Sequence, residues 1–408
     1  MKLSEELAWR GFIHQHTFAD ITEIDETNRT FYWGVDPSAP SMTVGNLAAA
    51  MLARNLIQHG YKAILLIGGA TGMIGDPDGK KQERDLLTLE QIDQNKRNIV
   101  AQYQQIFAGM PFEVVDNYDW FKDIGYLDFL REIGKKVPLS QLLDREFIKS
   151  RLGETGEGIS YAEFSYNLIQ GYDFLHLFQT KGVTLQVAGS DQWGNSITGV
   201  QLIKRVESAE AHVLTNPLII NKATGVKFGK TEGGAVWLDP TLTTPYQFYQ
   251  FWLNTDDEFA KELILKYTML DKATIDEVIA AQEAQPHLRI LQRRLADEAT
   301  AIVHGTERLE SVKAILGALF EGDGSASNLA DSDIESLAKE IPTVAAGTPL
   351  NYALQQAGIT SSNGEGRRLI ESGAVRINGQ KAEPADELRQ LASKDLIKVG
   401  KNKFVLAR

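Results

Sequence analysis

Thr30-Phe31-Tyr32-Trp33 and Ala63-Ile64-Leu65-Leu66-Ile67 are two short apolar runs that decide the fold. Their length and their β-branched and aromatic side chains are typical of buried strands. Residues 45–59, which separate them, have the apolar spacing of a helix. A strand, a helix and a second strand in this order predict a βαβ unit with two parallel strands.

The same alternation continues downstream. Residues 88–107 have the pattern of a second long amphipathic helix, and residues 112–115 that of a third short strand. We therefore expect an α/β fold with a doubly wound parallel, Rossmann-like sheet. Ligands of such sheets bind at the carboxyl ends of the strands, where this chain has Gly34-Val35-Asp36 and the glycine-rich stretch 68–76.

Two further segments have features of phosphate sites. Lys227-Phe228-Gly229-Lys230-Thr231 places two lysines around a glycine, and more glycines lie on either side. Such a loop is a mobile cationic arm suited to a polyphosphate. Residues 41–47 open the predicted helix, and a helix N-terminus is the other common phosphate site. Together the two segments predict ATP held between a fixed helix end and a closing loop.

The rest of the chain divides by composition. Strand signals stop near residue 244, and helical periodicity dominates up to residue 320. Residues 322–333 are rich in Gly, Ser, Ala, Asn and Asp, which indicates a linker. We expect four parts: a Rossmann-like catalytic domain over residues 1–220, a phosphate-binding loop and α-helical domain over 221–320, a linker over 321–346 and a small α+β domain over 347–408.

Composition excludes several classes of protein. The chain has 408 residues, 43% hydrophobic and 24% charged, as ordinary globular proteins do. It has no cysteine, so disulfides and thiolate metal sites are excluded. Residues 1–7 lack the apolar core of a signal peptide, and no apolar run approaches 18 residues. We expect a cytoplasmic protein without a membrane partner.

The charge is unevenly distributed. The chain has a formal net charge of −12, which by itself argues against a nucleic-acid partner. Residues 347–408, however, contain ten Lys/Arg and six Asp/Glu, a formal charge of +4, so the rest of the chain has −16. A basic module joined to an acidic body suits a protein that holds RNA at one end and performs small-molecule chemistry at the other.

Three strings carry a family resemblance: Gly-Gly-Ala-Thr-Gly-Met-Ile-Gly-Asp-Pro at 68–77, Gly-Ser-Asp-Gln-Trp-Gly-Asn at 189–195, and Lys-Phe-Gly-Lys-Thr-Glu-Gly-Gly-Ala at 227–235. In this order they resemble the bacterial tyrosyl-tRNA synthetases of class I, from about residue 5 to the end. The resemblance implies activation of L-tyrosine by ATP, then transfer to tRNA(Tyr), by a homodimer. It also implies Mg²⁺ that accompanies ATP, with no tightly bound cofactor and no metal site in the protein.

The resemblance also implies roles for individual residues. Tyrosine binding falls to Tyr32, Asp76, Tyr166, Gln170, Asp173 and Gln192, with Tyr32 and Asp173 at the phenol. ATP binding falls to Gly34, Asp36, Gly45, Asn46, Gly189, Asp191 and Lys230. Catalysis of the transfer at phosphorus falls to Lys227, Lys230, Thr231, Ser38, Thr43, Asn46, Lys80 and Arg84. The helical spacing of Tyr166, Gln170 and Asp173 places these three on one helix face.

One motif departs from the family pattern. The usual His-x-Gly-His has Thr43 and Asn46 at its histidine positions. An amide can present a donor near the place of an imidazole nitrogen, whereas a threonine hydroxyl is shorter and never cationic. We expect the loop of residues 227–231, the lysine loop, to supply more of the transition-state stabilisation here.

The basic end has its own pattern. Residues 350–354, 365–370 and 373–379 resemble the S4-type RNA-binding domain. The resemblance places Arg367 and Arg368 on a helix and Arg376 on the following strand, as RNA-binding residues.

Two alternatives remain open at this point. A tryptophan-specific class I enzyme shares the fold, although Tyr32 and Asp173 favour a phenol over an indole. A non-catalytic RNA-binding paralogue is allowed by the missing histidines, although Lys227 and Lys230 argue against it.

Overall fold

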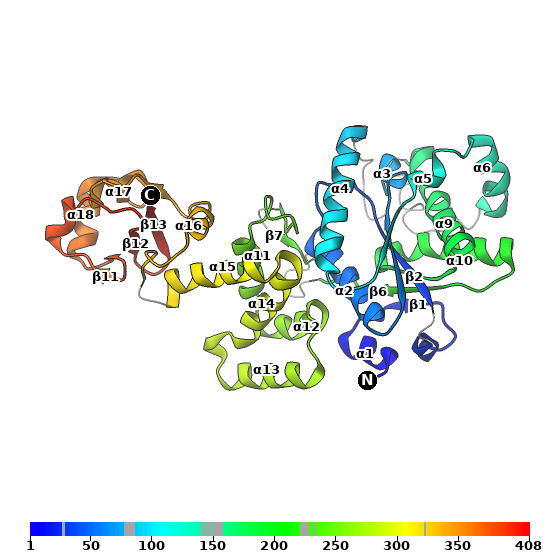
Figure 1. Cartoon of the computed structure of the whole chain (residues 1–408), viewed down its shortest axis with the longest axis horizontal. Helices are drawn as coiled ribbons and strands as arrows, with labels where there is room; N and C mark the ends of the chain where they lie inside the picture. The colour runs from blue at the N-terminus through cyan, green and yellow to red at the C-terminus, as the bar shows by residue number, and fades with distance from the viewer. Residues whose placement is uncertain are drawn as a thin grey trace. The chain divides into compact units, whose positions relative to one another are not determined.

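The computed structural model describes residues 1–26, 29–76, 86–139, 143, 148, 158–220, 228–231, 234–321 and 324–408, with the side chains of 230, 231 and 321 outside the description. These residues form two compact units, Met1–Val303 and His304–Arg408. Within the described part of the chain, no helix is both long and apolar enough to cross a membrane. Figure 1 shows the elements of each unit.

A six-stranded sheet organises the first unit, in the order β1-β6-β5-β2-β3-β4. The bounds are Thr30–Val35 for β2, Lys62–Ile67 for β3, Glu113–Asp116 for β4, Val183–Gly189 for β5 and His212–Asn216 for β6. These strands are parallel, so the predicted doubly wound sheet is confirmed. The short edge strand β1, Gln15–His16, is antiparallel to β6 and was not predicted.

Helices cover both faces of this sheet (Figure 1). On one face lie α2, Val44–Gln58, and α4, Leu89–Ile106; on the other lie α9, Tyr161–Lys181, and α10, Trp193–Glu207. Neighbouring residues of β2 point to opposite faces, since Tyr32 packs on Phe174 of α9 whereas Trp33 packs on Tyr103 of α4. The observed helices agree with the predicted ones to within one residue at each end.

The strand order reverses at β2, because β3 follows it on one side and β5 lies on the other. The crevice at the carboxyl ends of β2 and β5 is therefore the switch point at which such sheets bind ligands. Short elements close to this edge are α3, Thr71–Ile74, and α5, Tyr118–Phe121; α6, Tyr126–Glu132, follows α5.

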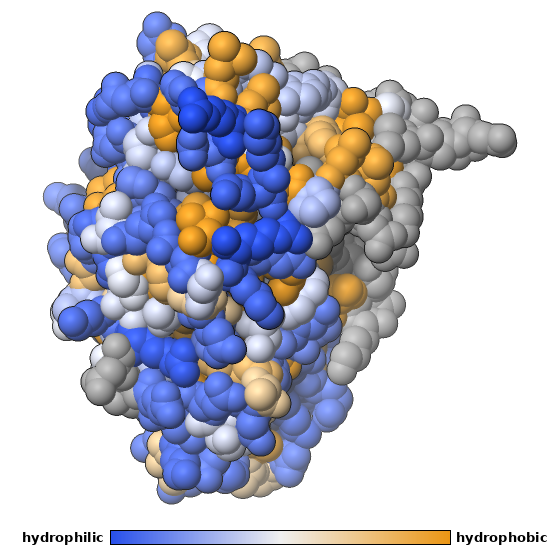
Figure 2. Space-filling model, turned by 90° about the vertical axis from the view of Figure 1, so that its right-hand side faces the viewer, coloured by the Kyte–Doolittle hydropathy of each residue, from blue (hydrophilic) through white to orange (hydrophobic). Residues whose placement is uncertain are grey.

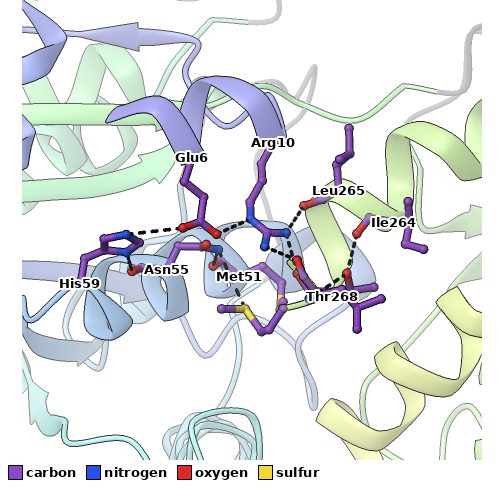
Figure 3. Close-up of polar contacts among 10 residues, drawn as sticks. Glu6, Arg10, Met51, Asn55, His59, Ile264, Leu265 and Thr268 are labelled. Carbon is purple, nitrogen blue, oxygen red and sulfur yellow. Dashed lines mark hydrogen bonds and ion pairs between the residues drawn. The ribbon is translucent and has the colours of Figure 1, made fainter. Parts of the chain in front are cut away.

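The N-terminal helix α1, Leu3–Arg10, contacts both α2 and a group of helices from later in the chain (Figure 3). That group comprises α11, Pro245–Leu253, α12, Asp257–Tyr267, α13, Lys272–Ala284, and α14, Ile290–His304. The Arg10 guanidinium is buried and donates to the carbonyls of Leu265, Thr268 and Leu270 at 2.9, 3.0 and 2.7 Å. At Leu265 and Thr268 this cation satisfies acceptors that the end of α12 leaves without helical partners, and at Leu270 it holds the connection to α13. Glu6 accepts from Arg10 at 2.8 Å and holds it there.

The second unit has a five-stranded sheet, in the order β11-β10-β12-β13-β9. Its strands are β9, Thr343–Val344, β10, Val375–Ile377, β11, Gln380–Lys381, β12, Leu396–Val399, and β13, Lys403–Ala407. Its helices are α15, Thr306–Leu316, α16, Asp331–Leu337, α17, Leu350–Gln356, and α18, Asn363–Glu371. This is the expected small α+β fold.

The expected linker over 321–346 differs from what the structure contains. Helix α16 lies inside it with Ile334 and Leu337 buried, and β9 pairs in parallel with β13. The Gly- and Ser-rich composition that indicated a linker ends near residue 333, and the apolar residues beyond it pack into the unit. The helical segment 221–320 is likewise divided, since α11 to α14 up to Val303 belong to the first unit and α15 belongs to the second.

Candidate active site

A cavity of about 380 Å³ lies at the carboxyl ends of β2 and β5. It brings together the predicted residues Tyr32, Gly34, Asp36, Ser38, Thr43, Gly45, Asn46, Asp76, Tyr166, Gln170, Asp173, Gly189, Asp191 and Gln192. The predicted residues Lys80, Arg84 and Lys227 lie outside the described residues. Lys230 and Thr231 have their backbone in β7, which pairs with β8, Gly234–Ala235, and their side chains are outside the description.

One end of the cavity holds a buried carboxylate. Asp173 on α9 is 2% exposed and accepts hydrogen bonds from Asn117 Nδ2 and Trp120 Nε1, both at 3.0 Å. Burial raises the pKa of Asp173 well above its usual range, and the two donors act against that rise because they favour the ionised form. Asn117 and Trp120 were not predicted, since a single Asn and a single Trp after a strand match no motif.

Three buried polar atoms that line the same cavity have no hydrogen-bond partner among the described residues. They are Tyr32 Oη, Gln170 Oε1 and Gln186 Oε1. Buried polar atoms are rarely left without partners, so these atoms are suited to a polar ligand. Gln186 was also missed from the sequence; it stands beside Tyr32 in the register of β5 against β2.

A polar network links this end of the cavity to the turn after β3. Asn117 Nδ2 also contacts Thr71 Oγ1 at 3.1 Å, and Thr71 Oγ1 donates to Asp36 Oδ1 at 2.6 Å. Asp36 Oδ2 accepts from Tyr166 Oη at 2.7 Å. A Cβ at Gly68 would lie only 2.0 Å from Asp36 Oδ1, so the first glycine of the turn makes room for this carboxylate.

The middle of the cavity is acidic. Burial raises the pKa of Tyr166 well above its usual range, and the charges of Asp36, Asp76 and Asp173 raise it further. Asp76 accepts a hydrogen bond from Gln192 Nε2, whose own Oε1 accepts from Asn195 Nδ2 at 3.1 Å. Converging carboxylates favour a cationic group on the ligand, such as an ammonium.

The opposite end of the cavity is the N-terminus of α2. Thr43 is the N-cap residue, and both its backbone N–H and its Oγ1 donate to Asn46 Oδ1, at 2.9 and 3.1 Å. Because Oδ1 is held by Thr43, the Nδ2 group of Asn46 remains for a ligand. The Thr43 hydroxyl proton is used within the cap, so Thr43 offers a ligand no donor while this bond is formed.

The two predicted phosphate segments meet at this helix end. Gly229 adopts φ +88°, and a Cβ there would lie 3.3 Å from the N atom of Gly45 and 3.4 Å from Cβ of Val44. The preceding Phe228 packs among Phe251, Trp252, Phe259 and Tyr267. Tyr267 in turn donates to the carbonyl of Val44 at 3.2 Å. The base of the lysine loop is therefore packed against the start of α2.

A third corner of the cavity contains Gly189 and Asp191. A Cβ at Gly189 would lie 2.5 Å from Asp191 Oδ1, so the glycine allows this exposed carboxylate to fold back over the end of β5. An exposed carboxylate at the rim is suited to accept hydrogen bonds from vicinal hydroxyls, such as those of a ribose.

Comparison with known proteins agrees with this geometry. The family model of class I tRNA synthetases (W and Y) matches residues 25–321, and that of the tyrosine–tRNA ligase SYY-like C-terminal domain matches residues 333–408. The chain is 42% identical over 405 residues to the tyrosine–tRNA ligase of Bacteroides fragilis, with 95% of this chain and 94% of the relative covered. It is 41% identical over 421 residues to that of Listeria monocytogenes, with 100% and 99% covered.

Among solved structures, a C-terminally truncated mitochondrial tyrosyl-tRNA synthetase from Aspergillus nidulans is similar, with a TM-score of 0.71 and 28% identity. The similarity covers 78% of this chain and 94% of that chain. The chain thus belongs to the class I tRNA synthetases for tryptophan and tyrosine, and it is an aminoacyl-tRNA synthetase. Within that family, its full-length relatives are tyrosine–tRNA ligases.

The raised pKa of Asp173 predicts a pH-dependent effect of Asp173→Asn. Above about pH 4 the unfolded chain loses a proton that the folded protein retains, so this group makes the free energy of unfolding fall as pH rises. Asparagine does not titrate, so the free energy of unfolding of the variant does not fall through this group. The stability of wild type minus that of the variant should therefore decrease from pH 4 to pH 7 in denaturant titrations. A difference that is constant or increases with pH would contradict the raised pKa.

Proposed function

We propose that this chain is a tyrosine–tRNA ligase, which converts L-tyrosine and ATP to tyrosyl-adenylate and pyrophosphate and then transfers tyrosine to the 3′ end of tRNA(Tyr). The observation that carries the choice of tyrosine is the pair formed by Asp173 and the unpartnered Tyr32 hydroxyl in one cavity. A phenol both donates and accepts a hydrogen bond, whereas an indole N–H only donates. Asp173 accepts from the phenol and Tyr32 donates to it.

The rest of the amino acid lies in the acidic middle of the cavity. The ammonium is bound by Asp76, by Gln170 and by the lone pairs of Tyr166, whose proton is donated to Asp36. Gln192 is bonded to Asp76 and orients it while its amide faces the carboxylate of the substrate. In this arrangement one carboxylate oxygen of tyrosine faces the N-terminus of α2.

ATP lies across the sheet edge from Asp191 to α2. Gly189 and Asp191 bind the ribose, Gly34 allows close approach of the nucleotide, and the triphosphate lies at the helix N-terminus around Gly45. The tyrosine carboxylate oxygen attacks the α-phosphorus, and the bond to pyrophosphate breaks. The protein contributes positioning and charge neutralisation.

Donors that follow the charge onto pyrophosphate come from several segments. The Asn46 amide and the Ser38 hydroxyl line the cavity at the start of α2. Lys230, in β7 of the lysine loop, contributes from the other side of the phosphates. Lys227, Thr231, Lys80 and Arg84 are assigned to the same task from the resemblance. Thr43 acts by orienting Asn46. Mg²⁺ arrives bound to the phosphates of ATP.

The second unit binds tRNA, and its three predicted arginines differ in their contacts. Arg367 forms two hydrogen bonds with Glu387, at 2.8 and 2.9 Å, and Arg376 donates to the carbonyl of Gly379 at 3.0 Å. The side chain of Arg368, also on α18, is exposed and forms no ion pair or hydrogen bond with the described residues. Arg368 is therefore the most available of the three for a phosphate.

We also propose that the chain acts as a homodimer in the cytoplasm. Figure 2 shows several hydrophobic groups among the hydrophilic ones on the face of the first unit turned to the viewer. Tyr126 and Leu127 on α6 are 62% and 76% exposed, and Tyr161 at the start of α9 is 61% exposed. The Tyr126 and Tyr161 hydroxyls are 3.3 Å apart, so these two exposed side chains are neighbours. Together with Leu127 they are the surface that a second copy would cover.

A non-catalytic paralogue and a tryptophan enzyme are tested together with this function. Exchange of labelled pyrophosphate into ATP should require tyrosine and should not respond to tryptophan. Lys230→Ala should slow this exchange by about 10²-fold and leave tyrosine affinity unchanged, because its contacts form with the leaving pyrophosphate. Lys272→Ala, which removes an exposed lysine of α13, is the control and should keep the wild-type rate. A wild-type protein without tyrosine-dependent exchange would contradict the proposal.

Adjacent arginines give a matched test of the RNA site. Arg368→Gln should weaken tRNA binding and reduce the slope of log K against log salt by about 1, because one phosphate contact is lost. Arg367→Gln, which makes the same charge change at a residue held by Glu387, should have the smaller effect. Both variants should retain pyrophosphate exchange. Equal effects on tRNA binding would show that the Glu387 pairing does not determine availability.

The dimer proposal is checked by sedimentation velocity. Leu127→Glu places a charge in the exposed patch and should shift the protein from dimer to monomer, because a buried unpaired charge is costly. Leu288→Glu, at another exposed leucine of the first unit, should leave the dimer intact. A wild-type protein that sediments as a monomer at micromolar concentration would refute the proposal.

A further inference from the structure

Three amide side chains on one face of α4 hold the loop that precedes α2. Asn95 Nδ2 donates to the Pro37 carbonyl at 2.9 Å, and Asn98 Nδ2 donates to the Pro40 carbonyl at 2.8 Å. Gln102 lies one turn further along the same face. The loop contains two prolines, which have no backbone N–H, so it cannot form a regular ladder and is shaped by side chains instead.

Gln102 has the densest contacts of the three. Its Oε1 accepts from the backbone N–H of Met42 at 2.9 Å, and its Nε2 donates to Ser41 Oγ at 2.8 Å. Ser41 Oγ donates to the Met42 carbonyl at 2.7 Å and accepts from the backbone N–H of Asp239 at 3.1 Å. One side chain of α4 thus joins the segment that opens α2 to a segment nearly 200 residues later in the chain.

That later segment leads back to the lysine loop. Leu238 donates to the Met42 carbonyl at 2.9 Å, and Val44 donates to the Val236 carbonyl at 3.0 Å. Val236 in turn donates to the carbonyl of Gly229 at 2.8 Å. Gln102 is therefore connected through short hydrogen bonds to both sides of the ATP site, although it does not line the cavity.

The contacts are made where their loss is costly. Ser41 and Met42 are 5% and 1% exposed, and Gln102 is half-buried. Without the Gln102 amide, the Met42 N–H loses its partner in a place that water reaches poorly. The strand-like pairing of residues 42–44 with 236–238 would then shift to find other partners, and the start of α2 would move relative to Gly229.

We propose that Gln102 is a positioning residue for adenylate formation, which acts through Ser41 and Met42 to fix the start of α2 against the segment that follows the lysine loop. The proposal rests on the function proposed above. It concerns the ATP side of the cavity alone, because the hydrogen bonds at Asp173 run through Asn117 and Trp120 and share no residue with Gln102.

Steady-state pyrophosphate exchange with Gln102→Leu tests this. The variant should lose roughly 10-fold in kcat/KM for ATP, while KM for tyrosine stays within about twofold of wild type. Gln104→Leu makes the same change at an exposed position of the same helix and should match wild type for both substrates. The proposal would be overturned if KM for tyrosine rose by as large a factor as kcat/KM for ATP fell, or if kcat/KM for ATP did not fall. Absence of exchange in wild type would instead refute the proposed function.

A double-mutant cycle with Ser41→Ala separates positioning from general destabilisation. If Gln102 acts through Ser41, the double variant should lose less in kcat/KM for ATP than the two single losses multiplied together. Multiplicative losses would overturn the proposal.

Gln102→Glu, which keeps the acceptor for the Met42 N–H, replaces the leucine variant if that variant does not fold. It should show a smaller loss of kcat/KM for ATP, with KM for tyrosine unchanged. A rise in KM for tyrosine as large as the loss for ATP would overturn the proposal.

Discussion

The pairing of β2 with parallel neighbours on both sides is the constraint on which the site depends. Val35 is in register with Ile67 of β3, and Tyr32 is in register with Gln186 of β5. The carboxyl ends of the three strands therefore reach one edge, and the residues that follow them converge on one cavity. A slip of β2 by one residue would turn Tyr32 away from the α9 face and remove its hydroxyl from the proposed phenol site.

The converging side chains are held by a network in which burial and hydrogen bonding oppose each other. Asp173 is desolvated, which favours its neutral form, yet it accepts two N–H donors, which favour its ionised form. Asn117 shares its amide between Asp173 and Thr71, and Thr71 bonds Asp36. The groups around the proposed amino-acid site are thus preorganised by neutral donors.

The proposed ATP side of the cavity depends on backbone pairing between distant segments. Residues 42–44 pair with 236–238, and Gly229 packs on the first turn of α2. In this chain the helix begins with a threonine cap whose hydroxyl proton is donated to Asn46. Among the described residues that line this side of the cavity, the side-chain donors are the Asn46 amide and the Ser38 hydroxyl, and none is an imidazolium. The proposed ATP site therefore depends on lysines and arginines of other segments to neutralise the phosphates.

Local patterns in the sequence were enough for the first strands and helices of the sheet, whereas most of the predicted cavity residues came from the family resemblance. The alternation of strand and helix gave β2, α2, β3, α4 and β4 to within two residues at each end, and the Tyr166, Gln170 and Asp173 spacing placed three side chains on one face of α9. These features depend on neighbours within a few turns, which a sequence displays directly.

Tertiary structure alone decided which ordinary polar residues matter. Asn117, Trp120, Gln186 and Gln102 belong to no motif. Asn117, Trp120 and Gln102 form hydrogen bonds with residues far away in the sequence, and Gln186 lies beside Tyr32 in the sheet. The same holds for Arg367 and Arg368, which are alike in sequence but differ in the structure because only one lies within reach of Glu387. It holds also for β9, which becomes a strand through its pairing with β13. Such roles depend on the path of the whole chain, which brings residues far apart in sequence within hydrogen-bond distance, and no local pattern records that path.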